Sequence, residues 1–423
     1  MSEQNTENSP SALHHHTRRM TGRDRHEEHR TATPLELLFD LTFVVAFGVA
    51  ASQFAHALAE AHFKTAFIGF GLASFAVSWA WINYSWFASA YDTDDWIFRV
   101  ATMVQMLGVL IFALGLPRMF TSIENGTNLD ISIMVLGYVV MRTALVFQWL
   151  RAARQDAARR RACFAYAKVV SLAQVGWVVL IFLPLSIIAT LLVAVVLIAV
   201  EMAGPYLAES KDGGTPWHAH HIVERYALFA IIALGEGVIG TVAALSAVIE
   251  AQGWAIDVAL VGLAGMGLTF GIWWVYFMLP SAPVLHTKRE KSFVWGYGLM
   301  ITIASIVATG AGLHVAAYFI EHKAKIGPLA TVLTVAIPVS IFLASIYALY
   351  AYLVEEFDRF HIWLLAGTAA VIALAVAAAG LGLAMPLCLI ILMLAPVVTI
   401  VGYETRGHKH QTVVLSKKLE RDA

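Results

Sequence analysis

The stretch LELLFDLTFVVA, from Leu35 to Ala46, begins a long apolar run but carries two carboxylates, Glu36 and Asp40. Residues four apart lie on the same face of a helix, so a helix here presents both acids on one side. Pro34, immediately before the stretch, suits the first turn of a helix, where the helix dipole also favours an acid. The stretch therefore predicts a membrane-crossing helix whose first two turns carry an acidic face.

The composition extends this prediction to the whole chain. Of its 423 residues, 59% are hydrophobic and only 13% are charged, whereas soluble globular proteins are about 45–50% apolar and about 25% charged. Such a composition indicates an all-α polytopic membrane protein embedded in the lipid bilayer. The two cysteines match no disulfide framework or zinc spacing. No phosphate loop, dinucleotide fingerprint, nucleophile elbow or zincin motif occurs, so neither a cofactor nor a nucleic-acid partner is predicted.

Twelve segments are long and apolar enough to cross a bilayer, which requires about 20 apolar residues. In the first half of the chain they cover residues 35–58, 65–88, 98–116, 131–150, 163–182 and 185–203. In the second half they cover residues 222–246, 256–279, 293–319, 327–353, 361–381 and 385–403. Pro184 stands where a tight turn would separate the fifth span from the sixth. The alternative for residues 163–203 is one long bent segment.

The positive charges predict the orientation of these spans, because Lys and Arg are enriched in cytoplasmic loops. Most of the 28 Lys and Arg residues lie in the tails and in loops that would share one side, including the clusters at 151–161 and 288–291. The opposite loops contain only Lys64, Arg118, Lys323 and Lys325. We therefore expect both termini in the cytoplasm, with a disordered tail at residues 1–33 and a second tail at residues 405–423.

The two halves of the chain show weak similarity to each other. Glu36 follows the first residue of the first span, and Glu224 occupies the corresponding place in the seventh. The second and eighth spans each end in an aromatic cluster, Trp81–Tyr84 and Trp273–Tyr276, before a charged loop. These matches predict two six-helix repeats, residues 34–210 and 211–404. Because both halves have the same orientation, the repeat would be parallel, with its axis along the membrane normal.

Ionisable residues inside the spans are the first candidates for function, because they are costly in a bilayer and usually face the protein interior. Glu36 and Asp40 are shallow, so they can be hydrated or can pair with Arg142 in span four or Lys168 in span five. Such pairs would lock three spans together, which is the structural alternative to a gate. Glu224 and Arg225 open span seven in the same way.

Glu236 differs from these acids in its depth. It lies twelve residues beyond Glu224, about 18 Å along a helix at 1.5 Å per residue, near the middle of the bilayer. Gly235, Gly237 and Gly240 surround it and would let another helix or a ligand approach. Transporters often place coupling sites at such midplane positions. Glu236 is therefore the leading candidate for a proton or cation site, and a neutral structural group is the alternative.

The segment WHAHHIVER, residues 217–225, raises the question of a metal site. His220 and His221 could share a helix face with Glu224, and they are the weak candidates for metal ligands. A metal site requires three or four converging ligands. Anchoring of the helix end at the membrane interface, by Trp217 with the histidines as caps, is the simpler interpretation, so no metal is predicted.

Two segments together resemble the hallmark motifs of the bacterial low-temperature-requirement A (LtrA) family. LELLFDLTFVVAF, residues 35–47, is similar to its E-L-F-F-D-L-V-F-V motif, and HIVERYALFAIIALGEGVIG, residues 221–240, to its H-x-x-E-R and L-G-E motif. Leu38 and Gly237 depart from the family pattern, which often has Phe and a small polar residue there. The resemblance covers nearly all of residues 30–405.

The resemblance implies a bacterial inner-membrane protein linked to growth in the cold, but it supplies no substrate. It also implies that five residues matter together: Glu36, Asp40, Glu224, Arg225 and Glu236. The leading hypothesis is a proton- or cation-linked transporter or permease of a small solute or ion, with a gate at the Glu36/Asp40 and Glu224/Arg225 pairs. An ion channel, a membrane-embedded enzyme acting on a lipid-like substrate and a non-catalytic scaffold are the alternatives. The oligomeric state is left open.

Overall fold

The computed structural model describes residues 17–24, 27, 30–126, 128–355, 359–408 and 411. The molecule is all-helical, with 84% helix, and the described residues contain no strand. Twelve helices in this part of the chain are long and apolar enough to cross a membrane. The fold is that of a polytopic helical membrane protein, as the composition predicts.

The helices follow the predicted spans closely. In the first half they are α1 (Pro34–Ala59), α2 (Phe63–Tyr91), α3 (Trp96–Asn125), α4 (Ser132–Gln155), α5 (Arg160–Ile181) and α6 (Ile187–Glu209). In the second half they are α7 (Ala219–Gln252), α8 (Ile256–Phe277), α9 (Ser281–Thr287), α10 (Ser292–Ile320), α11 (Pro328–Val354), α12 (Arg359–Gly380) and α13 (Met385–Gly402). A short 3₁₀ turn, η1 (Arg289–Lys291), precedes α10, and a π-helical turn, η2 (Tyr403–Gly407), follows α13.

Two of the predicted span boundaries lie next to prolines, and the structure agrees with only one of them. The turn at Pro184 separates α5 from α6, so residues 163–203 form two helices. The third span was expected to end at residue 116, but α3 continues through Pro117 to Asn125. Pro117 has no N–H to donate to the carbonyl of Ala113 four residues earlier, and membrane helices tolerate such an interruption when the helix is packed against its neighbours.

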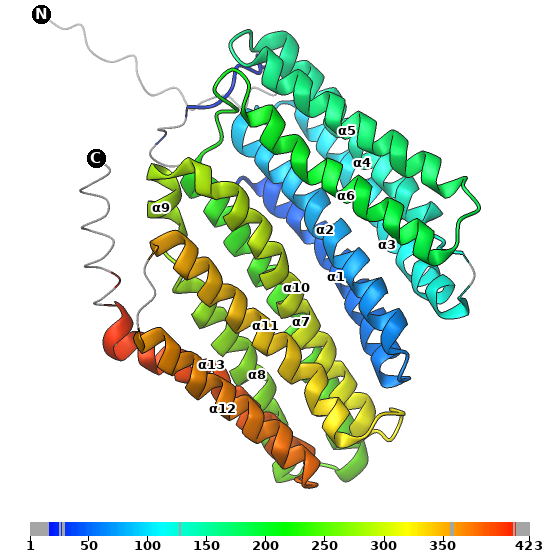
Figure 1. Ribbon diagram of the computed structural model, residues 1–423, viewed down its shortest axis with the longest axis vertical. Helices are drawn as coiled ribbons and strands as arrows, with labels where there is room; N and C mark the ends of the chain where they lie inside the picture. The colour runs from blue at the N-terminus through cyan, green and yellow to red at the C-terminus, as the bar shows by residue number, and fades with distance from the viewer. Residues whose placement is uncertain are drawn as a thin grey trace, which may run out of the picture.

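The two halves of the chain pack side by side and meet through α1 and α2 on one side and α7 and α10 on the other (Figure 1). Within each half the same pairs are in contact: α1 with α2 and α3, and α7 with α8 and α10. The pairs α3–α4 and α10–α11 also correspond. This is the pattern that two repeats would produce, and the repeat itself stays a prediction.

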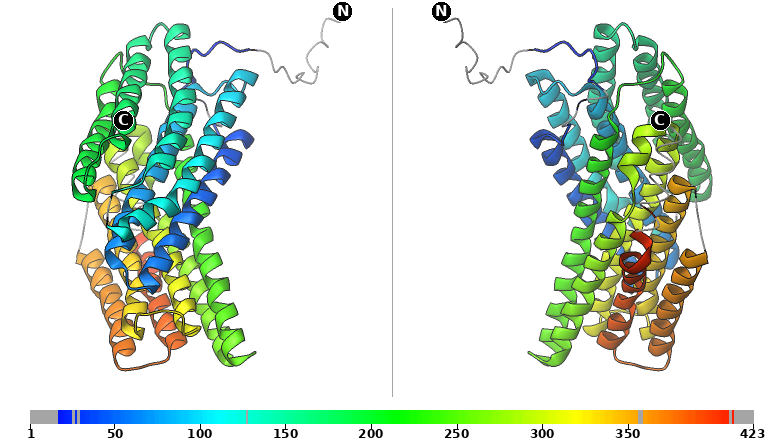
Figure 2. Two further views of the ribbon diagram at one scale, coloured as in Figure 1. Left: turned by 90° about the vertical axis from the view of Figure 1, so that its right-hand side faces the viewer. Right: turned by 90° about the vertical axis from the view of Figure 1, so that its left-hand side faces the viewer.

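The long helices lie roughly along a common axis, with successive helices reversing direction, so their ends lie at two opposite ends of the molecule (Figure 2). We call the end at which α1 and α7 begin the basic end, because the clusters at 151–161 and 288–291 lie there. The start of α1 is well defined at this end. Thr33 and Glu36 form a capping box, in which the Glu36 side chain accepts from Thr33 N at 2.8 Å.

Part of the N-terminal segment is attached to the basic end. Met20 is fully buried, and its backbone N–H donates to the Gln155 side chain at 2.7 Å. The backbone N–H of Arg23 donates to the carbonyl of Ala90 at 2.9 Å. Within the predicted disordered tail at residues 1–33, the backbone N–H groups of Arg18, Met20 and Arg23 donate to the bundle, so this part of the segment is attached to it. Residues 1–16 and 412–423 lie outside the described residues.

Candidate functional site

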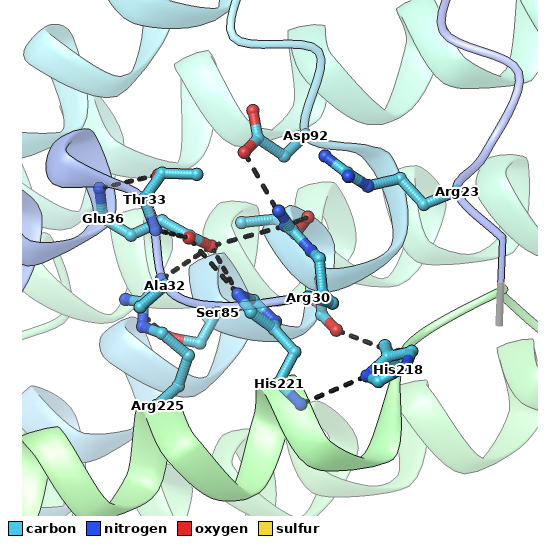
Figure 3. A network of polar contacts seen from close by, with 12 residues as sticks. Arg23, Arg30, Ala32, Thr33, Glu36, Ser85, Asp92, His218, His221 and Arg225 are labelled. Atoms are coloured by element: carbon cyan, nitrogen blue, oxygen red, sulfur yellow. Dashed lines mark hydrogen bonds and ion pairs between the residues drawn. The ribbon is translucent and has the colours of Figure 1, made fainter. Parts of the chain in front are cut away.

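The two sequence motifs meet at the basic end, where α1 and α7 begin. Glu36 on α1 faces His221 and Arg225, one helical turn apart on α7 (Figure 3). Arg225 Nη1 lies 2.8 Å from Glu36 Oε1, and His221 Nε2 lies 3.2 Å from the same carboxylate. All three side chains have an exposed fraction of 0%. Glu36 is therefore held by two residues of the other half of the chain.

Arg225 also binds the second acid of the opening stretch. Its Nη2 lies 2.5 Å from Asp40 Oδ1 and donates to Ser85 Oγ at 3.3 Å. The same Asp40 oxygen accepts from Trp81 Nε1 at 2.7 Å. One guanidinium thus bridges two carboxylates that share a face of α1, and α2 contributes a neutral donor, Trp81, and a neutral acceptor, Ser85. Buried charges persist in proteins when they are paired and hydrogen-bonded in this way.

A second, nearly fully buried ion pair lies next to this cluster. Arg30 Nη2 lies 3.6 Å from Asp92 Oδ2 and 3.9 Å from Glu36 Oε1. Burial lowers the pKa of the Arg30 guanidinium and raises the pKa of Asp92 to about 6, with the negative charge of Glu36 acting in the same direction on Asp92. Sequence reasoning missed both residues, because it treated Arg30 as a topology signal and Asp92 as part of a solvated loop.

Glu224 has a different role from its neighbour Arg225. Its carboxylate accepts from the backbone N–H of Ala32 at 3.3 Å, just before α1 begins. Whereas Arg225 contacts Glu36 and Asp40, Glu224 contacts the segment that precedes α1. The structure brings Glu36, Asp40 and Arg225 together, while Glu224 attaches the N-terminal segment to α7.

Glu36 and Asp40 do not pair with Arg142 or Lys168, which was one of the alternatives that the sequence left open. Lys168 is exposed, and Arg142 pairs with Glu201 on α6 at 2.5 Å, with both side chains nearly fully buried. Glu201 also accepts from Trp177 Nε1 at 2.7 Å. Sequence reasoning overlooked Glu201 because it ended the sixth span at residue 203, which left this acid close to the predicted membrane boundary. Since α6 continues to Glu209, Glu201 lies well inside the helix.

Glu236 lies in the middle of α7 and is 3% exposed. A side chain on Gly48 of α1 would approach its Oε1 to 3.3 Å, so α1 covers the carboxyl group closely. On α10, Gly310 packs against the Glu236 backbone. In the described part of the chain the Glu236 side chain makes no hydrogen bond or ion pair. Holding a negative charge there is costly, because burial removes water without supplying a partner.

The histidines of WHAHHIVER do not converge on a metal-binding geometry. The His218 side chain caps α7 by accepting from the backbone N–H of His221 at 3.2 Å, and burial lowers the pKa of His218. His221 is engaged with Glu36, whereas His220 is exposed near the ring of His286. Among the described residues, no group of three or more His, Cys, Asp or Glu side chains could hold a metal ion.

Comparison with known proteins agrees with the motif pair. The sequence model of the bacterial low temperature requirement A protein (LtrA) family matches residues 31–396. The chain belongs to the LtrA family. This LtrA-family protein is also similar to the uncharacterized protein RA0937 of Rhizobium meliloti (strain 1021), with 24% identity over 294 residues, 66% of this chain and 67% of that protein. No solved structure is significantly similar to it.

The LtrA-family protein has a cavity of about 220 Å³ between its two halves at the basic end. Trp79 and Trp86 of α2, Tyr166 of α5 and Pro205 of α6 line it from the first half. From the second half it is lined by α7 and by the start of α10, at Tyr226 and Tyr297 among others. No motif pointed to this cavity, because the aromatic residues of its wall come from several helices that are far apart in the sequence.

Two smaller cavities continue inward from this one. The first, about 10 Å³, shares Trp79, Tyr166 and Pro205 with the large cavity and is also lined by Arg142 and Glu201. The second, about 60 Å³, shares Glu201 and is otherwise largely apolar. The buried Arg142–Glu201 pair therefore lies between a cavity at the basic end and an apolar pocket deeper in the first half.

Proposed function

We propose that this LtrA-family protein is a secondary transporter, a permease that moves a small solute through the three cavities lined by α6. The observation that carries the proposal is the line of three cavities interrupted by one buried ion pair. A continuously open channel would need an unbroken polar pore, and a purely structural bundle would fill its interior to high packing density. A discontinuous path with a breakable barrier is instead typical of alternating access.

The barrier is built so that it can open. Pro205 has no N–H to donate to the Glu201 carbonyl four residues before it, so α6 lacks a backbone hydrogen bond at the level of the ion pair. Next to it, Gly204 packs directly against Val169 of α5. A bend of α6 at this point would separate Glu201 from Arg142 and join the large cavity to the apolar pocket. A solute group that binds one of the two charges would offset the cost of separating them.

Glu236 is the proposed coupling site for a proton or cation. Its carboxyl group is buried without a charged partner, so it either holds a proton or needs a cation beside the carboxylate. Ten residues before it on α7, about 15 Å along the helix, Tyr226 lines the large cavity. Movement of α7 would connect the two positions. The cluster of Glu36, Asp40 and Arg225 would hold the start of α7 against α1 during that movement.

A flux assay on the purified protein in liposomes tests this proposal. We expect uptake of at least one solute from a broad panel under a pH or sodium gradient. Glu236→Gln should abolish gradient-driven accumulation but retain solute exchange, because the coupling ion is lost and the solute path is not. Glu250→Gln, at the exposed far end of the same helix, is the matched control and should transport normally. Gradient-driven accumulation unchanged in Glu236→Gln would refute the coupling role, and gradient-independent single-channel currents would refute the permease.

A further inference from the structure

The wall of the large cavity is dominated by aromatic rings. Six of the lining residues are Trp79, Trp86, Trp149, Tyr166, Trp217 and Tyr226. The faces of indole and phenol rings carry a negative quadrupole, so a cation placed against them is attracted, most strongly where water is excluded. An aromatic wall of this kind is the chemistry by which proteins recognise quaternary ammonium groups.

One of the protein's own cations already contacts a ring of this wall, and a second contacts a ring of the deeper apolar pocket. The Arg289 guanidinium lies 3.6 Å from the centroid of the Trp217 ring at the rim of the cavity. At the inner end, the Arg142 guanidinium lies 5.0 Å from the centroid of Tyr138. The contact of Arg289 with Trp217 shows that an aromatic ring of this wall accepts a cation.

The charges that line the cavity favour a cation as well. Two acids, Glu209 and Glu290, line it, against the single guanidinium of Arg289. Glu209 is fixed in place, because its carboxylate accepts from the Tyr166 hydroxyl at 2.8 Å and from the Thr215 hydroxyl at 2.5 Å. Glu201 lines the small cavity next to the large one. A cation entering from the basic end would therefore meet two carboxylates in the large cavity, before the point where Glu201 is paired with Arg142.

One polar group in the wall is left without a partner. Trp79 is 1% exposed, and its indole N–H makes no hydrogen bond among the described residues, although the side chain lines both the large cavity and the cavity at the Arg142–Glu201 pair. A buried donor without an acceptor is costly. A solute with a hydroxyl or carbonyl oxygen near its cationic group would satisfy this donor.

We propose that the cavity binds a small organic cation, a quaternary or protonated amine that also carries an oxygen acceptor. The volume of about 220 Å³ lies below the range of about 300–1,000 Å³ for drug-sized ligands, which selects a small solute. This proposal rests on the proposed function only in that both use the same cavity: it names the class of solute that the permease would carry.

Equilibrium binding to the purified protein, measured by calorimetry, tests the proposal with a matched pair of probes. Choline is the cationic probe, and 3,3-dimethylbutan-1-ol is its neutral counterpart of nearly the same shape. We expect choline to bind at least tenfold more tightly than the neutral alcohol. Equal affinity for the two probes, or no binding of choline at millimolar concentration, would overturn the proposal. Preferential binding of a small carboxylate that is lost in Arg289→Gln would also overturn it.

Variants separate the effect of the rings and acids from a general loss of structure. Trp86→Leu should weaken choline binding about tenfold or more, and Trp86→Phe should restore part of it because a ring face returns. Glu290→Gln, an exposed position, should weaken binding severalfold without changing the unfolding temperature. Trp363→Leu, at a ring that is 74% exposed on α12, is the control and should bind choline normally. Unchanged affinity in both Trp86→Leu and Glu290→Gln would place the choline elsewhere and refute the site.

The outcome is independent of the flux assay, because binding is measured without a gradient. Choline binding with the expected variant pattern, combined with no flux of any solute, would refute the permease and leave the cation site intact. Flux of a neutral or anionic solute without amine binding would refute the cation site and leave the permease intact.

Discussion

Arg225 holds two carboxylates that lie 185 residues or more away in the sequence. The opening stretch places Glu36 and Asp40 on one helix face, and this much follows from the helical repeat alone. Their partner could not be identified in the same way. Arg142 and Lys168 have similar predicted depth, and depth does not specify which helices are neighbours. Only the contact of α1 with α7 selects Arg225.

Arg225→Gln should strongly destabilise the protein. The substitution leaves the buried Asp40 without its cation and removes the nearest cation from Glu36, and breaking a buried ion pair in this way typically costs about 3–5 kcal/mol. Arg225→Lys should recover only part of this loss, because a single ammonium group cannot bridge two carboxylates as a planar guanidinium does. Thermal or denaturant unfolding in detergent measures the effect. Arg99→Gln removes an exposed ion pair with Asp94, and it should cost about 1 kcal/mol or less. Equal losses in the two glutamine variants would contradict the role of Arg225.

Asp92 should make the stability of the basic end depend on pH. Because its pKa in the folded protein is raised to about 6 from the ordinary 3.8, the folded state favours the protonated carboxyl group. The stabilisation is complete below about pH 4 and is lost as the pH rises through 6. The unfolding temperature of Asp92→Asn relative to the wild type should therefore increase between pH 5 and pH 7.5. Asp94→Asn, at a side chain that is 43% exposed, should show no such increase.

At the scale of elements, the glycines near Glu236 have separate roles. Gly240 lies against the carbonyl of Gly310 on α10, and Gly237 against Thr269 on α8. These contacts confirm the expectation that glycine lets other helices approach α7 closely. Gly235 is the exception, since nothing lies within 4 Å of the position where its Cβ would be. The sequence pattern does not distinguish these three glycines, because the distinction depends on which helices surround α7.

Alanine substitutions should reveal this difference. Gly310→Ala places a methyl group against the backbone of Glu236 and Gly237, so α7 and α10 must separate, at a cost of about 1–3 kcal/mol. Gly235→Ala meets no neighbour and should stabilise α7 by about 0.5–1 kcal/mol, because alanine loses less backbone entropy in a helix. Unfolding curves of both variants in the same detergent measure the contrast. A destabilised Gly235→Ala would show that an approaching helix or ligand occupies that side of α7.

At the scale of the whole molecule, the unequal distribution of positive charge between the two ends predicts the orientation in the membrane. The basic end carries the 151–161 and 288–291 clusters, and it should face the cytoplasm. Alkaline phosphatase is active only when exported, so a fusion after Lys288, at the basic end, should be inactive. A fusion after Ala324, in the connection between α10 and α11 at the opposite end, should be active. The reverse pattern would invert the topology and would make the large cavity face outward.

The sequence by itself determines the class of fold, the twelve spans and the membership of the two motifs in one family. These properties depend on local hydrophobicity, helical periodicity and short motifs, which are written in the order of the residues. Tertiary structure alone decides that Glu36 and Asp40 bind Arg225, that Arg142 binds Glu201, and that aromatic rings enclose a cavity between the halves. Each of these depends on which helix faces lie together. Within a membrane protein almost every helix face is apolar, so the pattern of hydrophobicity does not specify the neighbours.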